Sequence, residues 1–164
     1  MRIVATSRKD SRIQFYSEGV VRRFWAEGFS EESVAVRFLW DTGAHISAIS
    51  KKVAEALNLH ILKEAAPLSG IGGSVPSKCC AAYFSIMGAD GSDFWTRVDL
   101  FATYPEEQLT GIDVVIGLDI ITDGKLVIEK IDGIPTLTFI PDHPDWKDAL
   151  NDPGFLSKFT ELEE

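Results

Sequence analysis

The chain has 164 residues, 45% of them apolar, and a formal net charge of −9. This length and apolar content suffice for one compact domain with its own core, while the acidic balance argues against nucleic-acid binding, which needs clustered Lys and Arg. No apolar run is long enough to span a membrane, and the first nine residues lack the apolar core of a signal peptide. The sequence therefore predicts a cytoplasmic protein that binds neither nucleic acid nor membrane.

The first 23 residues differ from the rest in charge. They carry six basic and two acidic side chains, a net +4, which leaves −13 for the remainder. A solvated strand that packs on the acidic body explains this difference, and a basic docking site for a partner is the alternative. Apolar patterning predicts strands over 13–16, 20–25 and 34–40, with a hairpin turn at Ser17-Glu18-Gly19 between the first two.

The third predicted strand runs directly into the turn Asp41-Thr42-Gly43-Ala44. Such a strand would deliver the carboxylate of Asp41 to a buried floor. Thr42 offers a hydroxyl that can lock the loop, and Gly43 lets the backbone turn close against its neighbour. Only the carboxylate is reactive. The alternative is a structural carboxylate that caps a turn.

A short helix is predicted over residues 50–58. Ser50 can cap its N-terminus, Val53, Ala54 and Leu57 share one face, and Asn58 can end it.

A glycine-rich stretch follows, in which Gly70, Ile71, Gly72 and Gly73 place one apolar residue among three glycines. This composition suits the tip of a hairpin, and a merely flexible loop is the alternative. A phosphate-binding loop is not indicated, because no Gly-Lys-Ser follows and the next segment alternates like a strand.

Long antiparallel strands are predicted over 79–87 and 94–102, joined by a turn at 88–93. Cys79 and Cys80 are adjacent, which is neither a metal-ligand spacing nor a good disulfide geometry, so we expect reduced core or interface residues, and a redox role is the alternative. The three histidines form no ligand motif either. The sequence therefore predicts no metal site and no cofactor.

The second apolar element is Asp113-Val114-Val115-Ile116-Gly117-Leu118-Asp119-Ile120-Ile121. It predicts a strand over 113–117 and a short helix over 118–122. Strands are predicted next over 125–129 and 136–140, around a turn at Asp132-Gly133. The acidic tail, 141–164, is predicted to pack on the surface or to be partly disordered.

These motifs, in this order, resemble the active-site loop, the flap and the partner strand of the retropepsins, the single-domain aspartic peptidases of retroviral type. The resemblance implies an all-β fold with one or two short helices, a closed acid-protease β-barrel with one lobe per chain. The domain would comprise residues 1–140, with its core over 34–140 and a flap at about 66–78, and the tail would follow over 141–164.

The resemblance also implies a function, that of an aspartic endopeptidase acting on peptide or protein substrates. The chain holds one Asp-Thr-Gly, so the two carboxylates of such a site require a homodimer with one Asp41 from each copy. Thr42, Gly43 and Ala44 would support the loop, and Gly70, Ile71, Gly72 and Gly73 would bind the substrate. Ile116, Gly117, Leu118 and Asp119 would form the partner loop.

The chain departs from the retroviral pattern at two places. Retroviral enzymes usually carry an acidic residue after Asp-Thr-Gly-Ala and an Arg after the later Gly, which pair and brace the site. Here His45 and Leu118 stand there, and a reversed pair of His45 with Asp119 is the hypothesis that replaces the brace. A catalytically inactive module that binds a peptide or partner in the same groove is the alternative function.

Overall fold

A computed structural model of the chain describes residues 1–7, 13–25, 28–70, 73–91 and 94–143. These residues form strands and short helices in the order β1 (Ile3–Thr6), β2 (Phe15–Trp25), β3 (Gly28–Trp40), β4 (Ala48–Ser50), α1 (Lys51–Ala56), β5 (Ile61–Gly70), β6 (Gly73–Met87), β7 (Phe94–Tyr104), the 3-10 helix η1 (Glu106–Gln108), β8 (Val114–Ile116), α2 (Leu118–Ile121), β9 (Gly124–Ile131) and β10 (Ile134–Pro141). The predicted all-β class is confirmed. Within the described ranges, no helix is long and apolar enough to cross a membrane.

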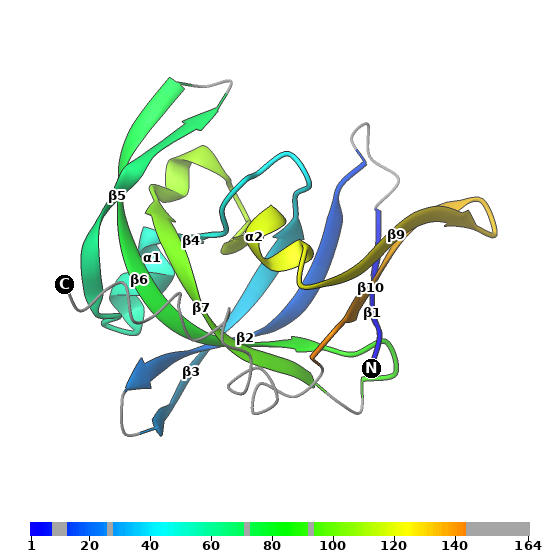
Figure 1. Cartoon of the computed structure of the whole chain (residues 1–164), viewed down its shortest axis with the longest axis horizontal. Helices are drawn as coiled ribbons and strands as arrows, with labels where there is room; N and C mark the ends of the chain where they lie inside the picture. The colour runs from blue at the N-terminus through cyan, green and yellow to red at the C-terminus, as the bar shows by residue number, and fades with distance from the viewer. Residues whose placement is uncertain (8–12, 26–27, 71–72, 92–93, 144–164) are drawn as a thin grey trace.

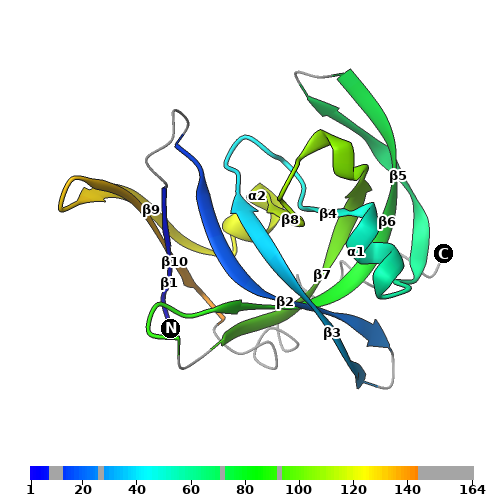
Figure 2. The same cartoon turned by 180° about the vertical axis from the view of Figure 1, so that it is seen from behind.

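The strands form two sheets. The larger has the order β2-β3-β8-β4-β7-β6-β5, and β2 also pairs with β6, so the pairings from β2 through β3, β8, β4, β7 and β6 close on themselves. The smaller sheet has the order β1-β10-β9. In both views the β5–β6 hairpin and the β9–β10 hairpin lie at opposite sides of the molecule, with the loop that follows β3 between them (Figures 1 and 2).

The short strand β8 is inserted between β3 and β4. It runs parallel to β3, with Trp40 opposite Ile116, and antiparallel to β4, with Ala48 opposite Val115. β3 and β4 are therefore separated by a strand that comes more than 60 residues later in the chain. The loop that carries Asp41 connects β3 to β4, so it must pass around the end of β8.

The predicted helix near residue 50 is confirmed. α1 begins after Ser50, whose Oγ accepts a hydrogen bond of 3.3 Å from the N–H of Val53. Asn58 follows the helix with φ of +47°, a left-handed conformation that asparagine tolerates better than most residues. The strand predictions after residue 79 are also confirmed, although β6 begins earlier and β9 and β10 are longer than expected.

The predicted turn at Ser17-Glu18-Gly19 is wrong, because β2 runs without a break through it. Gly19 lies where β2 pairs with Val36 of β3 on one side and with Ile86 of β6 on the other. A Cβ at this position would lie 2.0 Å from the carbonyl oxygen of Ser85. The glycine therefore marks a close approach of two strands, a role that local sequence does not distinguish from a turn.

The main hydrophobic core joins side chains of both sheets and is rich in aromatic residues. Phe84 is fully buried and meets Trp95 and Phe101 edge to face, with ring centroids 5.5 Å apart in both pairs. Trp40 and Trp95 both pack against Phe139 of the smaller sheet, at 5.0 and 5.1 Å. The indole N–H of Trp40 donates to Ser17 Oγ at 2.9 Å, so its polar atom is satisfied in the core.

Substitution of Gly19 tests the close approach of β2 and β6. We expect Gly19→Ala to lower the free energy of unfolding by about 3 kcal/mol, because the backbone of β6 must shift to admit the methyl group. Gly133→Ala is the control, since Gly133 has a positive φ but no atom within 4 Å of its Cβ position, and it should cost about 1 kcal/mol. Urea unfolding measures both, and equal losses would contradict the packing explanation.

Cys80 gives a second test of the core. Cys79 and Cys80 are both buried thiols, and burial, assisted by the neighbouring Cys79, raises the pKa of Cys80 from 9.0 to about 12. Above pH 9.0 the unfolded chain loses this proton while the folded chain keeps it, so stability should fall as pH rises toward 12. We expect Cys80→Ala to show a smaller fall in urea unfolding over this range, and an unchanged fall would contradict the assignment.

Candidate active site

Asp41 lies at the point where β3 leaves the sheet. The preceding Trp40 is 4% exposed and faces the core, whereas the side chain of Asp41 is half-buried. The backbone N–H of Asp41 still donates to the carbonyl of Ile116 at 3.0 Å, which continues the β3–β8 pairing by one residue. The position of the carboxylate is therefore fixed by β8.

The turn after Asp41 folds back on the carboxylate. The N–H of Gly43 donates to Asp41 Oδ1 at 2.9 Å, and the N–H of Ala44 donates to the Asp41 carbonyl at 3.2 Å. A Cβ at Gly43 would lie 3.2 Å from the same Oδ1, a tight contact. The first bond orients one oxygen of the Asp41 carboxylate, and the second closes the backbone turn. Thr42 is exposed beside it.

The partner loop after β8 holds the far end of the Asp41 loop. The N–H of Leu118 donates to the Ala44 carbonyl at 2.8 Å, and the N–H of Asp119 donates to the His45 carbonyl at 3.3 Å. Gly117 is needed here because a Cβ on it would lie only 2.7 Å from the carbonyl carbon of Ile46. The two loops are in backbone contact, and a side chain at Gly117 would separate them.

The carboxylate of Asp119 braces these two loops through Ser47. Its Oδ2 accepts from the N–H of Ser47 at 2.8 Å, and its Oδ1 accepts from Ser47 Oγ at 2.7 Å. Ser47 Oγ in turn accepts from the N–H of Gly117 at 2.9 Å, and Ser47 is fully buried. The role of Ser47 was not predicted from the sequence. Its position as the one polar residue in the stretch Ile46-Ser47-Ala48-Ile49, six residues after Asp41, could have indicated a buried hydrogen bond.

The hypothesis of a His45–Asp119 pair is not supported by these contacts. Both oxygens of Asp119 are engaged by Ser47, and Oδ1 also accepts from the N–H of Ile120 at 3.0 Å. Among the described residues, His45 forms no ion pair with Asp119, and its side chain is exposed. A neutral hydroxyl and two backbone amides replace the expected cation.

A cavity of about 450 Å³ opens beside Asp41. The cavity lies between the Asp41 loop, the β5–β6 hairpin and the segment that leads from β7 to β8. Its lining is Asp41, Ala44, Ile46, Ala48, Leu68, Ser69, Gly73, Tyr104, Gln108, Leu109 and Val115. Apart from Asp41, this lining is mainly apolar.

The sequence predicted the flap side of this cavity but not the side that Tyr104, Gln108 and Leu109 form. Gly73 belongs to the predicted flap, and it pairs with Gly70 at the end of the β5–β6 hairpin with a φ of +112°. Ile71 and Gly72, the predicted flap apex, lie outside the described residues. The wall formed by Tyr104, Gln108 and Leu109 was not predicted. The hydroxyl of Tyr104 donates to the carbonyl of Ile112, eight residues later in the chain, at 2.7 Å.

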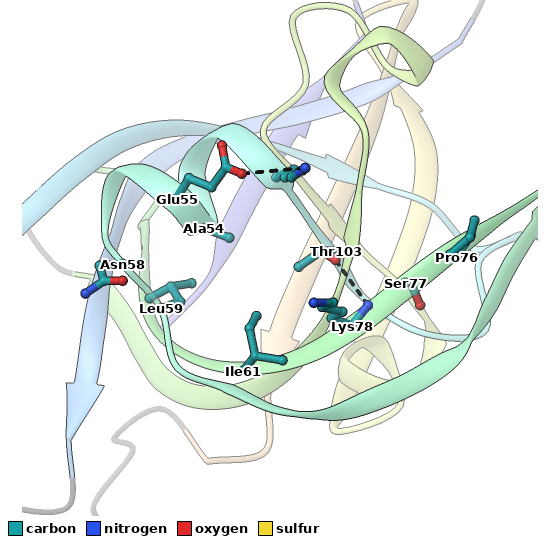
Figure 3. A pocket seen from close by; sticks show the side chains of 10 residues that line it. Ala54, Glu55, Asn58, Leu59, Ile61, Pro76, Ser77, Lys78 and Thr103 are labelled. Carbon is teal, nitrogen blue, oxygen red and sulfur yellow. Dashed lines mark hydrogen bonds and ion pairs between the residues drawn. The ribbon is translucent and has the colours of Figure 1, made fainter.

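A second cavity, of about 390 Å³, lies between α1 and the base of the β5–β6 hairpin (Figure 3). Its only described acidic lining residue is Glu55, which forms an ion pair of 3.6 Å with Lys51. Two further lining residues on the neighbouring strands β6 and β7 are joined, because the N–H of Lys78 donates to Thr103 Oγ1 at 3.2 Å (Figure 3). Because the carboxylate of Glu55 is paired with Lys51, the described lining of this cavity offers no counterpart to the chemistry of Asp41.

A sequence model of the family described as aspartyl protease matches residues 28–120, more than half of the chain. The chain therefore belongs to the aspartyl protease family, and the resemblance drawn from the three motifs is confirmed at this level. No curated protein sequence matches the chain.

Solved structures that are similar to the chain include a retropepsin-like aspartic protease from Rickettsia conorii. The two share 15% sequence identity with a TM-score of 0.48, over 86% of this chain and 93% of that one. The retroviral protease-like domain of Ddi1 from Leishmania major shares 16% identity with a TM-score of 0.39, over 77% of this chain and 95% of that one.

The Ser47–Asp119 brace predicts a pattern of mutational effects. Ser47→Ala and Asp119→Asn should each lower the free energy of unfolding by about 1–3 kcal/mol, because each leaves a buried polar group without its partner. The double variant should lose less than the sum, since both changes break the same contacts. His45→Ala, in the same loop, is the control and should change stability by less than about 0.5 kcal/mol.

Urea unfolding of the four variants measures these differences. A large loss in His45→Ala with no loss in Asp119→Asn would show that His45, rather than Ser47, braces the loop.

Proposed function

We propose that this protein is an aspartic endopeptidase of the retropepsin type, active as a homodimer. The observation that carries the proposal is the cavity of about 450 Å³ that is lined both by Asp41 and by Leu68, Ser69 and Gly73 of the predicted flap. Family membership supports it independently. The roles given below to single residues follow from this proposal.

Catalysis requires two carboxylates, and one chain supplies a single Asp-Thr-Gly. In the proposed dimer, Asp41 and Asp41 of the partner subunit face one another across a two-fold axis. Two carboxylates at hydrogen-bonding distance do not readily ionise together, so the pair keeps one proton. One member is then a base and the other an acid.

The proposed reaction is addition of water to the scissile carbonyl. The ionised Asp41 removes a proton from the water as its oxygen bonds to the carbonyl carbon, and the protonated Asp41 of the partner subunit donates its proton to the carbonyl oxygen. The tetrahedral product then collapses with cleavage of the C–N bond, and the leaving nitrogen takes a proton from the pair. No covalent enzyme intermediate forms.

The surrounding residues have supporting roles in this proposal. The hydrogen bond from the N–H of Gly43 to Asp41 Oδ1 orients the carboxylate, and Thr42 reaches across the dimer axis to keep the two loops in register. Gly73 and its neighbours in the flap bind the substrate backbone as an added strand. The apolar side chains at Ile46, Leu109 and Val115 favour apolar substrate side chains.

The test is peptide cleavage by wild type and by Asp41→Asn from acid to neutral pH, with a peptide library rich in apolar residues as substrate. Asn preserves the shape of Asp but cannot take or give the proton, so we expect a loss of at least about a thousandfold in rate. Asp142→Asn changes an exposed carboxylate outside the cavity and should cleave as wild type.

Equal cleavage by Asp41→Asn would refute the proposal. A wild-type protein that cuts none of the library yet binds peptides would favour the alternative, a peptide-binding module built on the same groove.

A further inference from the structure

The cavity between α1 and the base of the β5–β6 hairpin has an apolar floor that the proposed reaction does not use. Ala54 of α1 and Leu59 are each 6% exposed, Ile61 of β5 is 39% exposed, and all three line this cavity of about 390 Å³ (Figure 3). Ala54 and Leu59 belong to the main hydrophobic core, so the cavity lies directly over it. An apolar side chain that filled this space would leave water and contact the core.

The strand β6 borders this cavity without offering it a regular backbone edge. Pairing of β6 with β7 begins at Cys79, opposite Ala102, so the described part of β6 before Cys79 pairs with β5 alone. On its other side, the N–H of Lys78 already donates to Thr103 Oγ1, and Pro76 has no N–H to donate. Backbone pairing with an added strand is therefore blocked here, and recognition of a ligand must come from side chains.

The charges around the cavity favour an acidic ligand. The described lining carries two lysines, Lys51 and Lys78, and one carboxylate, Glu55, on a chain whose net charge is −9. Glu55 is paired with Lys51 at 3.6 Å, whereas Lys78 forms no ion pair with any described residue. The lining is thus positive on a negative molecule. Its complement is a segment that combines apolar side chains with carboxylates.

The chain itself contains such a segment beyond its described part, Phe159-Thr160-Glu161-Leu162-Glu163-Glu164. Two of these six residues are apolar, three are acidic and none is basic. The described part ends at His143, whose carbonyl accepts from the indole N–H of Trp95 at 3.2 Å. The fifteen residues 144–158 can span up to about 50 Å, whereas a domain of this length is about 40 Å across. The segment can therefore reach the cavity from this anchor.

A segment on the same chain also has an advantage over a separate partner of the same composition. Its effective concentration at the cavity is on the order of millimolar, so a few apolar and charged contacts suffice to bind it.

This cavity and the candidate active site share the β5–β6 hairpin. Leu68 and Gly73 of the hairpin line the cavity beside Asp41. Pro76, three residues after Gly73 on the same strand, lines the cavity beside α1. A segment bound beside α1 therefore holds the base of the hairpin whose far end lines the Asp41 cavity. The hairpin must move to admit a peptide in the proposed reaction, and holding its base slows that step.

We propose that residues 159–164 bind in the cavity beside α1 of their own chain and thereby restrain the β5–β6 hairpin, which lowers the rate of peptide cleavage. Leu162 occupies the apolar floor, and the carboxylates on either side of it, Glu161 and Glu163, lie near Lys78. The regulatory part of this inference rests on the proposed function, whereas the binding part does not.

The test measures amide hydrogen exchange of residues 159–164 in the full chain. In wild type these amides should exchange at least about tenfold more slowly than in a free peptide of the same sequence. Lys78→Glu reverses the charge at the cavity and should abolish this protection. Adding Glu161→Lys and Glu163→Lys to that variant should restore it, because the charges are exchanged. Lys130→Glu makes the same change at an exposed position outside the cavity and should leave the protection unchanged.

The binding inference is overturned if the wild-type amides exchange as in the free peptide, if Lys78→Glu keeps the protection, if Lys130→Glu loses it equally, or if the charge exchange restores nothing. Protection that grows with protein concentration would assign the segment to the cavity of a second copy and overturn binding within one chain. An unprotected segment in a wild type that binds an added acidic peptide, lost in Lys78→Glu, would assign the cavity to a separate partner.

Cleavage rates separate the regulation from the chemistry. Lys78→Glu should cut peptides faster than wild type, by up to about tenfold, because tenfold protection means that about nine in ten molecules hold the hairpin. The charge-exchanged variant should return to the wild-type rate. A protected segment in a wild type that cuts no peptide supports the binding and counts against the proposed function. Equal cleavage by wild type and by Lys78→Glu, with the protection lost, supports the function and overturns the regulation.

Discussion

The site depends on one constraint, the insertion of β8 between β3 and β4. This strand of three residues accepts the N–H of Asp41 at its end, through the Ile116 carbonyl, and leads directly into the loop that supports the far side of the Asp41 turn. Because β8 pairs with both neighbours at once, the two strands that flank the Asp41 loop cannot move independently. The carboxylate thus sits on a loop whose two ends are held by the same short strand.

Buried polar groups reinforce this arrangement at two places. At the first, Asp119 of α2 and Ser47 of the Asp41 loop are joined by two hydrogen bonds, and Ser47 is fully buried. At the second, Arg97, which is 5% exposed, pairs with Asp99 on its own strand and with Asp123 after α2. A buried cation without such partners would be costly, so the pair with Asp123 fixes how β7 meets the base of β9. The first group includes Asp119 of α2, and the second includes Asp123, which follows α2 directly before β9. The helix α2 therefore links the candidate site to the β9–β10 hairpin.

Elements with a local physical cause were predictable from the sequence. Ser50 and Asn58 delimit α1 because capping and left-handed conformations are properties of single residues. The turn between β9 and β10 was likewise predictable, because Asp132 and Gly133 both tolerate the positive φ angles that they adopt there. Gly19 was misread, because a glycine in a turn and a glycine under a neighbouring strand look alike until the neighbour, Ser85, is known. The role of Ser47 was missed because its partner Asp119 is 72 residues away.

The sequence by itself determined the all-β class and the protein family, and it singled out Asp41 as the candidate carboxylate, because a strand, a turn and a motif are read over a few adjacent residues. Only the tertiary structure decided what surrounds that carboxylate. The pairing of β8 with β3, the Ser47–Asp119 brace and the cavity that Asp41 shares with Leu68 and Leu109 all bring together residues that are distant in the chain. Such contacts depend on how the strands are ordered in the sheet, and that order is set by packing of the whole core rather than by any local pattern.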